Sequence, residues 1–178
     1  MIVILAGVAG SGKSTVGRIV ATRLGWTYED SDILHSAADI AKMVSGVPLG
    51  DADRWPWLRT VATWMDQQTA AGRSAVLACS ALKRSYRDYL RRGRPGVEIV
   101  LLEVDQATLM ARLTDRHGHF FPSKLLQSQL ADLEMPDPDE HVLVVPAAGT
   151  PAQMAAKIIE GLGLDAQPPG SPHPPASG

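Results

Sequence analysis

The chain has 178 residues, of which 45% are hydrophobic and 20% are charged, a composition typical of a soluble globular protein with one hydrophobic core. Its formal net charge of -2 provides no electrostatic basis for binding nucleic acid or an anionic membrane surface, so neither partner is expected. A single cysteine, Cys79, excludes an intrachain disulfide, and the short apolar start MIVILAG resembles neither a signal peptide nor a membrane span. We therefore expect a cytoplasmic protein.

Short runs rich in Val, Ile and Leu alternate with longer segments of helical periodicity, as in proteins whose helices cover both faces of a parallel sheet. This pattern predicts strands near residues 2–6, 26–30, 75–79, 97–103 and 141–145. It predicts helices near residues 13–24, 36–45, 55–71, 83–92, 105–116, 123–134 and 151–162. The expected fold class is a three-layer α/β domain over residues 1–164, followed at 165–178 by a disordered tail rich in Pro, Gly and Ser.

The segment GVAGSGKS matches the phosphate-binding pattern G-x-x-x-x-G-K-[ST] and lies between the first expected strand and helix. Its glycines let successive backbone N–H groups turn toward one anion, and the helix dipole adds favourable potential. We expect Lys13 to reach the β- and γ-phosphates and the Ser14 hydroxyl to coordinate Mg²⁺. The predicted nucleotide-binding residues are Gly7, Gly10, Ser11, Gly12, Lys13, Ser14 and Thr15, the last of which could instead only begin the helix.

The identity of the nucleotide follows from what surrounds this loop. No Asn-Lys-x-Asp stretch of the kind that reads guanine occurs late in the chain, which favours ATP. The strand expected at 75–79 does not end in a carboxylate, so Mg²⁺ would be held by Ser14, water and the acids of a later segment, DSDILH. These features favour a small-molecule kinase over a motor or a switch.

DSDILH follows the second expected strand, at the edge of the sheet where open α/β folds bind ligands. A kinase needs a carboxylate here that orients the acceptor hydroxyl and takes its proton, and Asp32 is the candidate. Asp30 is a candidate for holding a magnesium-bound water, and His35 for contacting a polyol hydroxyl. Alternatively, Asp32 caps the following helix and His35 is a surface residue.

Several further segments follow in a consistent order, namely KM, GVPL, DADR, PWL, CSALK, YR and GHFF. Together with the phosphate-binding loop and DSDILH, they resemble the gluconokinase family of ATP-dependent sugar-acid kinases over most of residues 7–145. The resemblance implies a P-loop fold of the nucleoside-monophosphate-kinase type, with a five-stranded parallel sheet and a helical lid. It further implies transfer of the ATP γ-phosphate to the 6-hydroxyl of D-gluconate, and a homodimer.

A pocket for gluconate, a polyol with one carboxylate, needs a few cations and several hydrogen-bonding groups. Lys83 and Arg87 are one turn apart on a helix that Ser80 is expected to cap, so they should project together. The expected substrate-binding residues are Lys42, Arg54, Lys83 and Arg87 as cations, with Asp32, His35 and Asp53. Alternatively, Lys42 is a solvated helix residue, and Asp53 and Arg54 form a surface ion pair.

The expected lid covers about residues 116–135 and contains the segment HGHFFPS. Arg112 and Arg116 share a helix face leading into it, where they would offset charge on the transferring phosphate; alternatively, they only complement the helix C-terminus. His119 is expected to contact the substrate. His117 departs from the family, in which a fixed cation is expected at this position. The predicted catalytic residues are thus Lys13, Asp32 and Arg116.

Two other functions fit parts of the sequence. Shikimate kinases share the phosphate-binding loop and an Asp-x-Asp after the second strand, but a Gly-Gly-rich turn would be expected where this chain has CSALK. A non-catalytic ATP-dependent switch would need neither an acceptor site nor the lid arginines.

Overall fold

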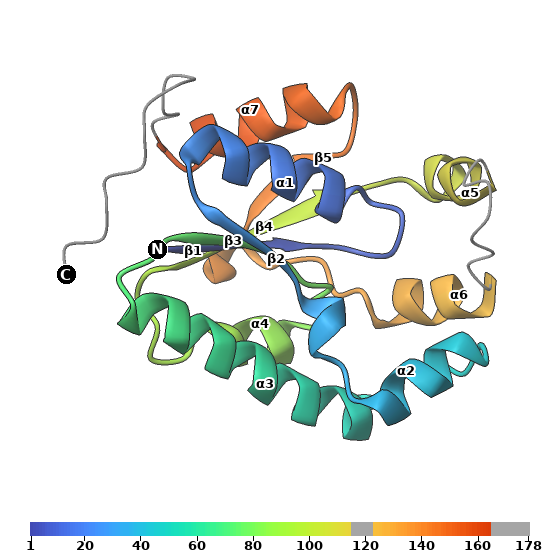
Figure 1. Cartoon of the computed structure of the whole chain (residues 1–178). Coiled ribbons are helices and arrows are strands. Elements are labelled where there is room, and N and C mark those ends of the chain that lie inside the picture. Colours follow the sequence, from blue (N-terminus) through green and yellow to red (C-terminus); the bar gives the residue numbers. More distant parts are fainter. Residues whose placement is uncertain (115–122, 165–178) are drawn as a thin grey trace.

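The computed structural model describes residues 1–114 and 123–164. In these residues, five parallel strands form one sheet in the order β2-β3-β1-β4-β5, with helices on both faces (Figure 1). The strands are β1 (Ile2–Ala6), β2 (Thr27–Asp30), β3 (Ala75–Ala78), β4 (Val97–Glu103) and β5 (Leu143–Pro146). The expected three-layer α/β fold is confirmed.

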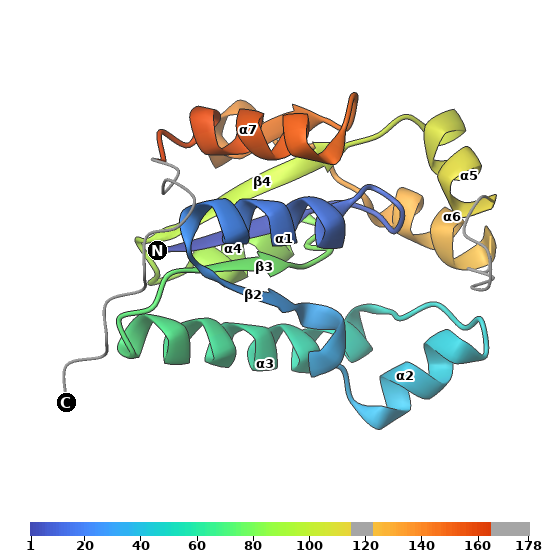
Figure 2. The same ribbon diagram turned by 45° about the horizontal axis from the view of Figure 1, so that its top comes forward.

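Figures 1 and 2 both show α1 and α7 on one face of the sheet and α3 and α4 on the other, with α2, α5 and α6 beyond the carboxyl ends of the strands. The described helices are α1 (Lys13–Leu24), α2 (Ala37–Val44), α3 (Asp51–Ala70), α4 (Arg84–Arg91), α5 (Gln106–Thr114), α6 (Ser123–Asp132) and α7 (Pro151–Gly161), with one-turn 3-10 helices η1 (Ser31–Leu34) and η2 (Pro138–Glu140). Among the described residues, no helix has both the length and the apolar character needed to cross a membrane.

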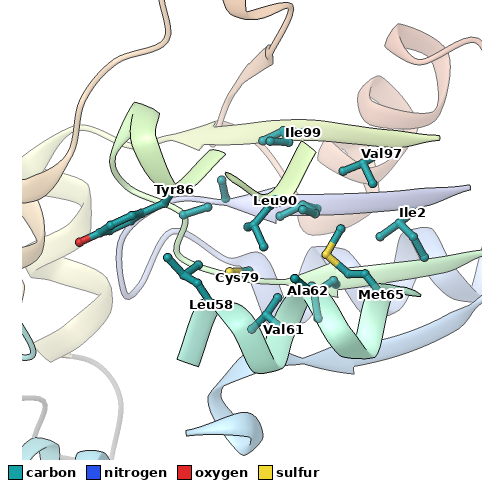
Figure 3. Close-up of a cluster of buried hydrophobic side chains, with 14 of the residues drawn as sticks. Ile2, Leu58, Val61, Ala62, Met65, Cys79, Tyr86, Leu90, Val97 and Ile99 are labelled. Atoms are coloured by element: carbon teal, nitrogen blue, oxygen red, sulfur yellow. The ribbon is translucent and has the colours of Figure 1, made fainter. Parts of the chain in front are cut away.

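The central strand β1 is buried on both faces, which explains its uninterrupted apolar sequence. Because side chains alternate along a strand, Ile2 and Ile4 pack in the cluster under α3 and α4, while Val3 and Leu5 pack in the cluster under α1 and α7. Figure 3 shows the first cluster, in which Met65 from α3 approaches the strands.

On the α3 and α4 side, one helix begins earlier than expected and the other begins near the expected residue but has a different cap. Helix α3 begins at Asp51 instead of near residue 55, because Asp53 accepts a hydrogen bond from the Gly50 N–H at 3.1 Å and closes a first turn ahead of Pro56. Helix α4 begins at Arg84, and Ser80 does not cap it. The α4 N-terminus is instead capped by a carboxylate far along the chain, since the Arg84 N–H donates to Glu134 Oε2 at 2.7 Å.

A third, smaller apolar cluster lies at the carboxyl edge of the sheet. It is formed by the buried residues Val8, Leu82, Leu109 and Leu126, which come from the phosphate-binding loop, the segment after β3, α5 and α6. This cluster packs α5 and α6 against the edge at which the chain places its polar site residues.

Candidate active site

The phosphate-binding loop connects β1 to α1 with the backbone geometry that an anion cradle requires. The backbone φ angles of Gly7, Gly10 and Gly12 are 134°, 81° and 101°, values that residues other than glycine rarely adopt. At Gly7 a Cβ would lie 2.9 Å from Ser11 Oγ and 3.0 Å from the Leu102 carbonyl oxygen, so the loop also needs glycine there for space. Gly12 is the N-cap of α1 and has no side chain that could cap the helix, an arrangement that suits phosphate binding at a helix N-terminus.

The side chains expected to bind the nucleotide and the metal lie next to this loop. Lys13 Nζ donates to the Val8 carbonyl at 2.9 Å and so folds back over the loop. The Ser14 hydroxyl donates to Asp30 Oδ2 at 2.8 Å, and the Tyr28 hydroxyl donates to the same oxygen at 3.3 Å. Hydroxyl and carboxylate oxygens are ligands suited to Mg²⁺, so Ser14 and Asp30 fit the metal role predicted for them.

Asp32 occupies the one-turn helix η1 at the carboxyl end of β2. Its N–H donates to Asp30 Oδ1 at 3.2 Å, so a single carboxylate links Ser14 to the backbone of Asp32. Although Asp32 is exposed, partial desolvation of its carboxylate raises its pKa, and the charge of Asp30 raises it further, while Lys13 and His35 lower it. A carboxylate of raised pKa beside a phosphate-binding loop suits proton acceptance from an acceptor hydroxyl.

His35 is packed more tightly than a freely exposed polyol contact would be. Its ring stacks on Trp57 with centroids 4.5 Å apart and planes 7° apart, and its side chain is 6% exposed. Its Nδ1 lies 3.7 Å from Asp39 Oδ2, and burial lowers its pKa in spite of the neighbouring carboxylates Asp32 and Asp39. The structure thus assigns His35 a packing contact, and its role toward an acceptor stays a prediction.

Two of the four expected acceptor cations are brought together. Arg54 Nη2 lies 3.2 Å from Asp132 Oδ2, and Lys83 Nζ lies 3.4 Å from Asp132 Oδ1. Lys83 also donates to Asp51 at 2.8 Å, and this hydrogen bond is the main cause that raises the pKa of Lys83. Arg54 and Lys83 therefore lie together with Asp132, where α3 and the start of α4 meet α6.

Lys42 is held apart from that group by a different carboxylate. Its Nζ donates to Asp53 Oδ1 at 2.5 Å, and this bond is the main cause that lowers the pKa of Asp53. Asp53 therefore pairs with Lys42, not with Arg54 as the surface ion-pair alternative assumed. The pair links the C-terminal part of α2 to the first turn of α3.

Arg87 does not project with Lys83, contrary to the expectation from helical spacing. Its side chain is 1% exposed and forms a two-pronged ion pair with Glu140, with Nε at 2.7 Å and Nη2 at 2.9 Å from the carboxylate oxygens. Its Nη1 donates to the carbonyls of Leu82 and Glu134, each at 2.9 Å. With every nitrogen of the guanidinium bonded inside the protein, Arg87 has no group to offer a substrate.

The expected lid residues are mostly beyond what the structure describes. Arg112 belongs to α5, but its side chain, like Arg116 and His119 as a whole, lies outside the described residues. Their predicted roles therefore stay predictions.

Some contacts at the site have no signal in the sequence. Gln129 Oε1 of α6 accepts a hydrogen bond from the Ala9 N–H of the phosphate-binding loop at 2.6 Å. The Tyr86 hydroxyl donates to Asp51, which also binds Lys83. These contacts join residues between 32 and 120 positions apart, so no local motif could have revealed them.

The comparisons with known proteins first define a class. A family model described as an AAA domain matches residues 2–136, and the chain belongs to this family of P-loop proteins. A solved sugar kinase from Janibacter sp. is 44% identical, with a TM-score of 0.86 and coverage of 92% of this chain and 94% of that one. The fold and the phosphate-binding loop are thus those of a P-loop kinase.

Within that class, the chain belongs to the gluconokinase family. It is 46% identical over 156 residues to the gluconokinase of Gluconobacter oxydans, covering 88% of both proteins. A solved gluconokinase from Sinorhizobium meliloti is 41% identical, with a TM-score of 0.81 and coverage of 90% of each chain.

Proposed function

We propose that this protein transfers the γ-phosphoryl group of ATP to the 6-hydroxyl of D-gluconate, giving 6-phospho-D-gluconate and ADP. The observation that carries the proposal is the hydrogen-bonded chain from Ser14 through Asp30 to the backbone of Asp32. It connects the phosphate-binding loop to a carboxylate of raised pKa, on the edge of the sheet where the cations Arg54 and Lys83 also lie. Family membership supports both the reaction and the substrate.

Each residue has a role in this proposal that its surroundings support. Asp32 orients the acceptor hydroxyl and takes its proton, while Lys13 offsets charge on the β- and γ-phosphates. Ser14 and Asp30 hold Mg²⁺, directly or through water, and the metal neutralises phosphate charge when bound. Arg54 and Lys83 receive the carboxylate of gluconate, with Lys42 and Asp53 at the edge of the same surface.

The proposal extends to the organisation of the protein. Residues 1–164 form the catalytic domain, in which a lid over about residues 116–135 contributes Arg116 and His119 and the helix that leads into it contributes Arg112. The protein acts in the cytoplasm as a homodimer, and the tail predicted for residues 165–178 lies outside the described residues.

The reaction is tested by measuring ADP release from Mg²⁺-ATP with no acceptor and with D-gluconate, shikimate, glucose or AMP. We expect stimulation by gluconate alone. Stimulation by shikimate or another acceptor would show that the protein is a kinase but that gluconate is not its substrate. Stimulation by none of them would favour an ATP-binding switch.

The role of Asp32 is tested by Asp32→Asn, which should retain nucleotide binding and lower kcat by about 10²- to 10⁴-fold, the contribution of a positioned general base. Asp66→Asn is the matched control, because Asp66 lies on α3 and its carboxylate pairs with Arg94, outside the site. Near-normal turnover by Asp32→Asn would remove Asp32 from this role.

A further inference from the structure

One carboxylate of α6 lies between two of the cations proposed to bind the acceptor. Asp132 places Oδ2 at 3.2 Å from Arg54 Nη2 and Oδ1 at 3.4 Å from Lys83 Nζ. Its side chain is 25% exposed, so a small ligand can reach it. Asp132 is thus a partly accessible anion in a place where the acceptor's own carboxylate would bind.

Neither cation depends on Asp132 for its position. Arg54 Nε donates to the Leu49 carbonyl at 3.2 Å, and Lys83 Nζ donates to Asp51 at 2.8 Å. Both bonds have hydrogen-bond geometry, and each cation keeps its bond when Asp132 loses its charge, although the ion pair of Arg54 with Asp132 is equally short at 3.2 Å and that of Lys83 is 3.4 Å. Removing the Asp132 charge should therefore leave both cations in place.

Arg54 retains binding capacity beyond its present contacts. The residue is 7% exposed, and its Nη1 is buried without a hydrogen-bond partner among residues 1–114 and 123–164. A buried guanidinium nitrogen normally has a partner, and a carboxylate can bond to two guanidinium nitrogens together. An acceptor carboxylate that engages Nη1 would come close to Asp132, so the two anions would repel each other while sharing the same cations.

We infer that Asp132 is a specificity-determining residue, which sets the affinity for an anionic acceptor by competing with its carboxylate for Arg54 and Lys83. The inference rests on the proposed function and adds to it that α6 limits how tightly the acid is held. Asp132 offsets the electrostatic repulsion between Arg54 and Lys83, and the same negative charge weakens the binding of an anionic acceptor.

The test is Asp132→Asn, which removes the charge at nearly constant shape. We expect KM for gluconate to fall by about three- to fivefold, the range for a partly exposed charge pair, with kcat and KM for ATP unchanged. Asp132→Glu, which keeps the charge, should retain the wild-type KM. Asp66→Asn, an equal charge change outside the site, should also retain it and so excludes a general effect of net charge.

A double-mutant cycle tests whether Asp132 acts through the cations. In an Arg54→Met background, Asp132→Asn should lower KM for gluconate by less than it does in the wild type. Thermal unfolding verifies that each variant is folded. If Asp132→Asn does not fold, Asp132→Ser replaces it as the variant without the charge. An unchanged or higher KM in a folded, charge-removed variant overturns the inference.

The wild-type assay separates the two proposals. If gluconate does not stimulate the wild type, the proposed function fails and the inference fails with it. If gluconate stimulates the wild type and charge removal leaves its KM unchanged, only the assignment of Asp132 fails.

Discussion

Replacing Arg87 with methionine should destabilise the protein without changing its affinity for gluconate. Arg87 and Glu140 have side chains that are 1% and 2% exposed, and Arg87 also binds two backbone carbonyls. Arg87→Met leaves the Glu140 carboxylate buried without its cation, which costs about 3–5 kcal/mol. A typical domain has only about 5–15 kcal/mol of stability, so the loss should be large.

Urea unfolding at low temperature measures this loss, and KM for gluconate is measured under conditions where the variant remains folded. The double variant Arg87→Met with Glu140→Leu should recover part of the stability, because no buried charge is left unpaired. Recovery should be incomplete, since the Leu82 and Glu134 carbonyls lose their donor. Wild-type stability combined with a raised KM would refute the structural role and restore Arg87 to the substrate site.

Three further predictions follow from local geometry. Asp30→Asn should raise the Mg²⁺ concentration for half-maximal activity about tenfold, measured by titrating Mg²⁺; an unchanged requirement would remove Asp30 from the metal site. Because the folded state lowers the pKa of His35, the unfolded chain binds its proton first, and stability should fall as pH drops below about 6.5. His35→Gln should flatten that pH dependence in urea unfolding, and an unaltered slope would contradict this account. Gly17→Ala would place a Cβ 2.8 Å from Tyr28 Cε2 and should cost about 1–3 kcal/mol in the same assay, whereas Gly96→Ala, whose nearest contact is 3.8 Å, should cost little.

The sequence predicts the sheet well because the relevant signals are local. A strand such as β1, buried on both faces, has to be apolar throughout, and the loop after it has to supply glycines at fixed positions. The helix α4 begins within one residue of its predicted start, but the group that caps it could not be predicted in the same way. Its cap, Glu134, is 50 residues away, and only the folded chain brings the two together.

In the candidate site, too, local sequence signals predict some residues, while the positions of others depend on segments far along the chain. The phosphate-binding loop and DSDILH lie near each other in the fold because each follows a strand, and the carboxyl ends of parallel strands lie at the same edge of the sheet. Lys83 and Arg87 are one turn apart, yet Lys83 is partly exposed while Arg87 is fully buried. What separates them is the position of Glu140 on a distant segment, which periodicity within α4 cannot reveal.

The segment from Asp132 to Glu140 distributes negative charge over the cations of α3 and α4. Asp132 meets Arg54 and Lys83, Glu134 caps α4, and Glu140 neutralises Arg87. Burial decides the consequence of losing each contact, because removing one partner of an ion pair closed to solvent leaves an uncompensated buried charge, while an ion pair that solvent reaches can be shared with a ligand. Since the chain as a whole has a net charge of -2, its overall charge does not attract an anionic acceptor, and the proposed site would depend on the local balance between Arg54, Lys83 and Asp132. A substitution in this segment should therefore change stability at Glu140 and acceptor affinity at Asp132.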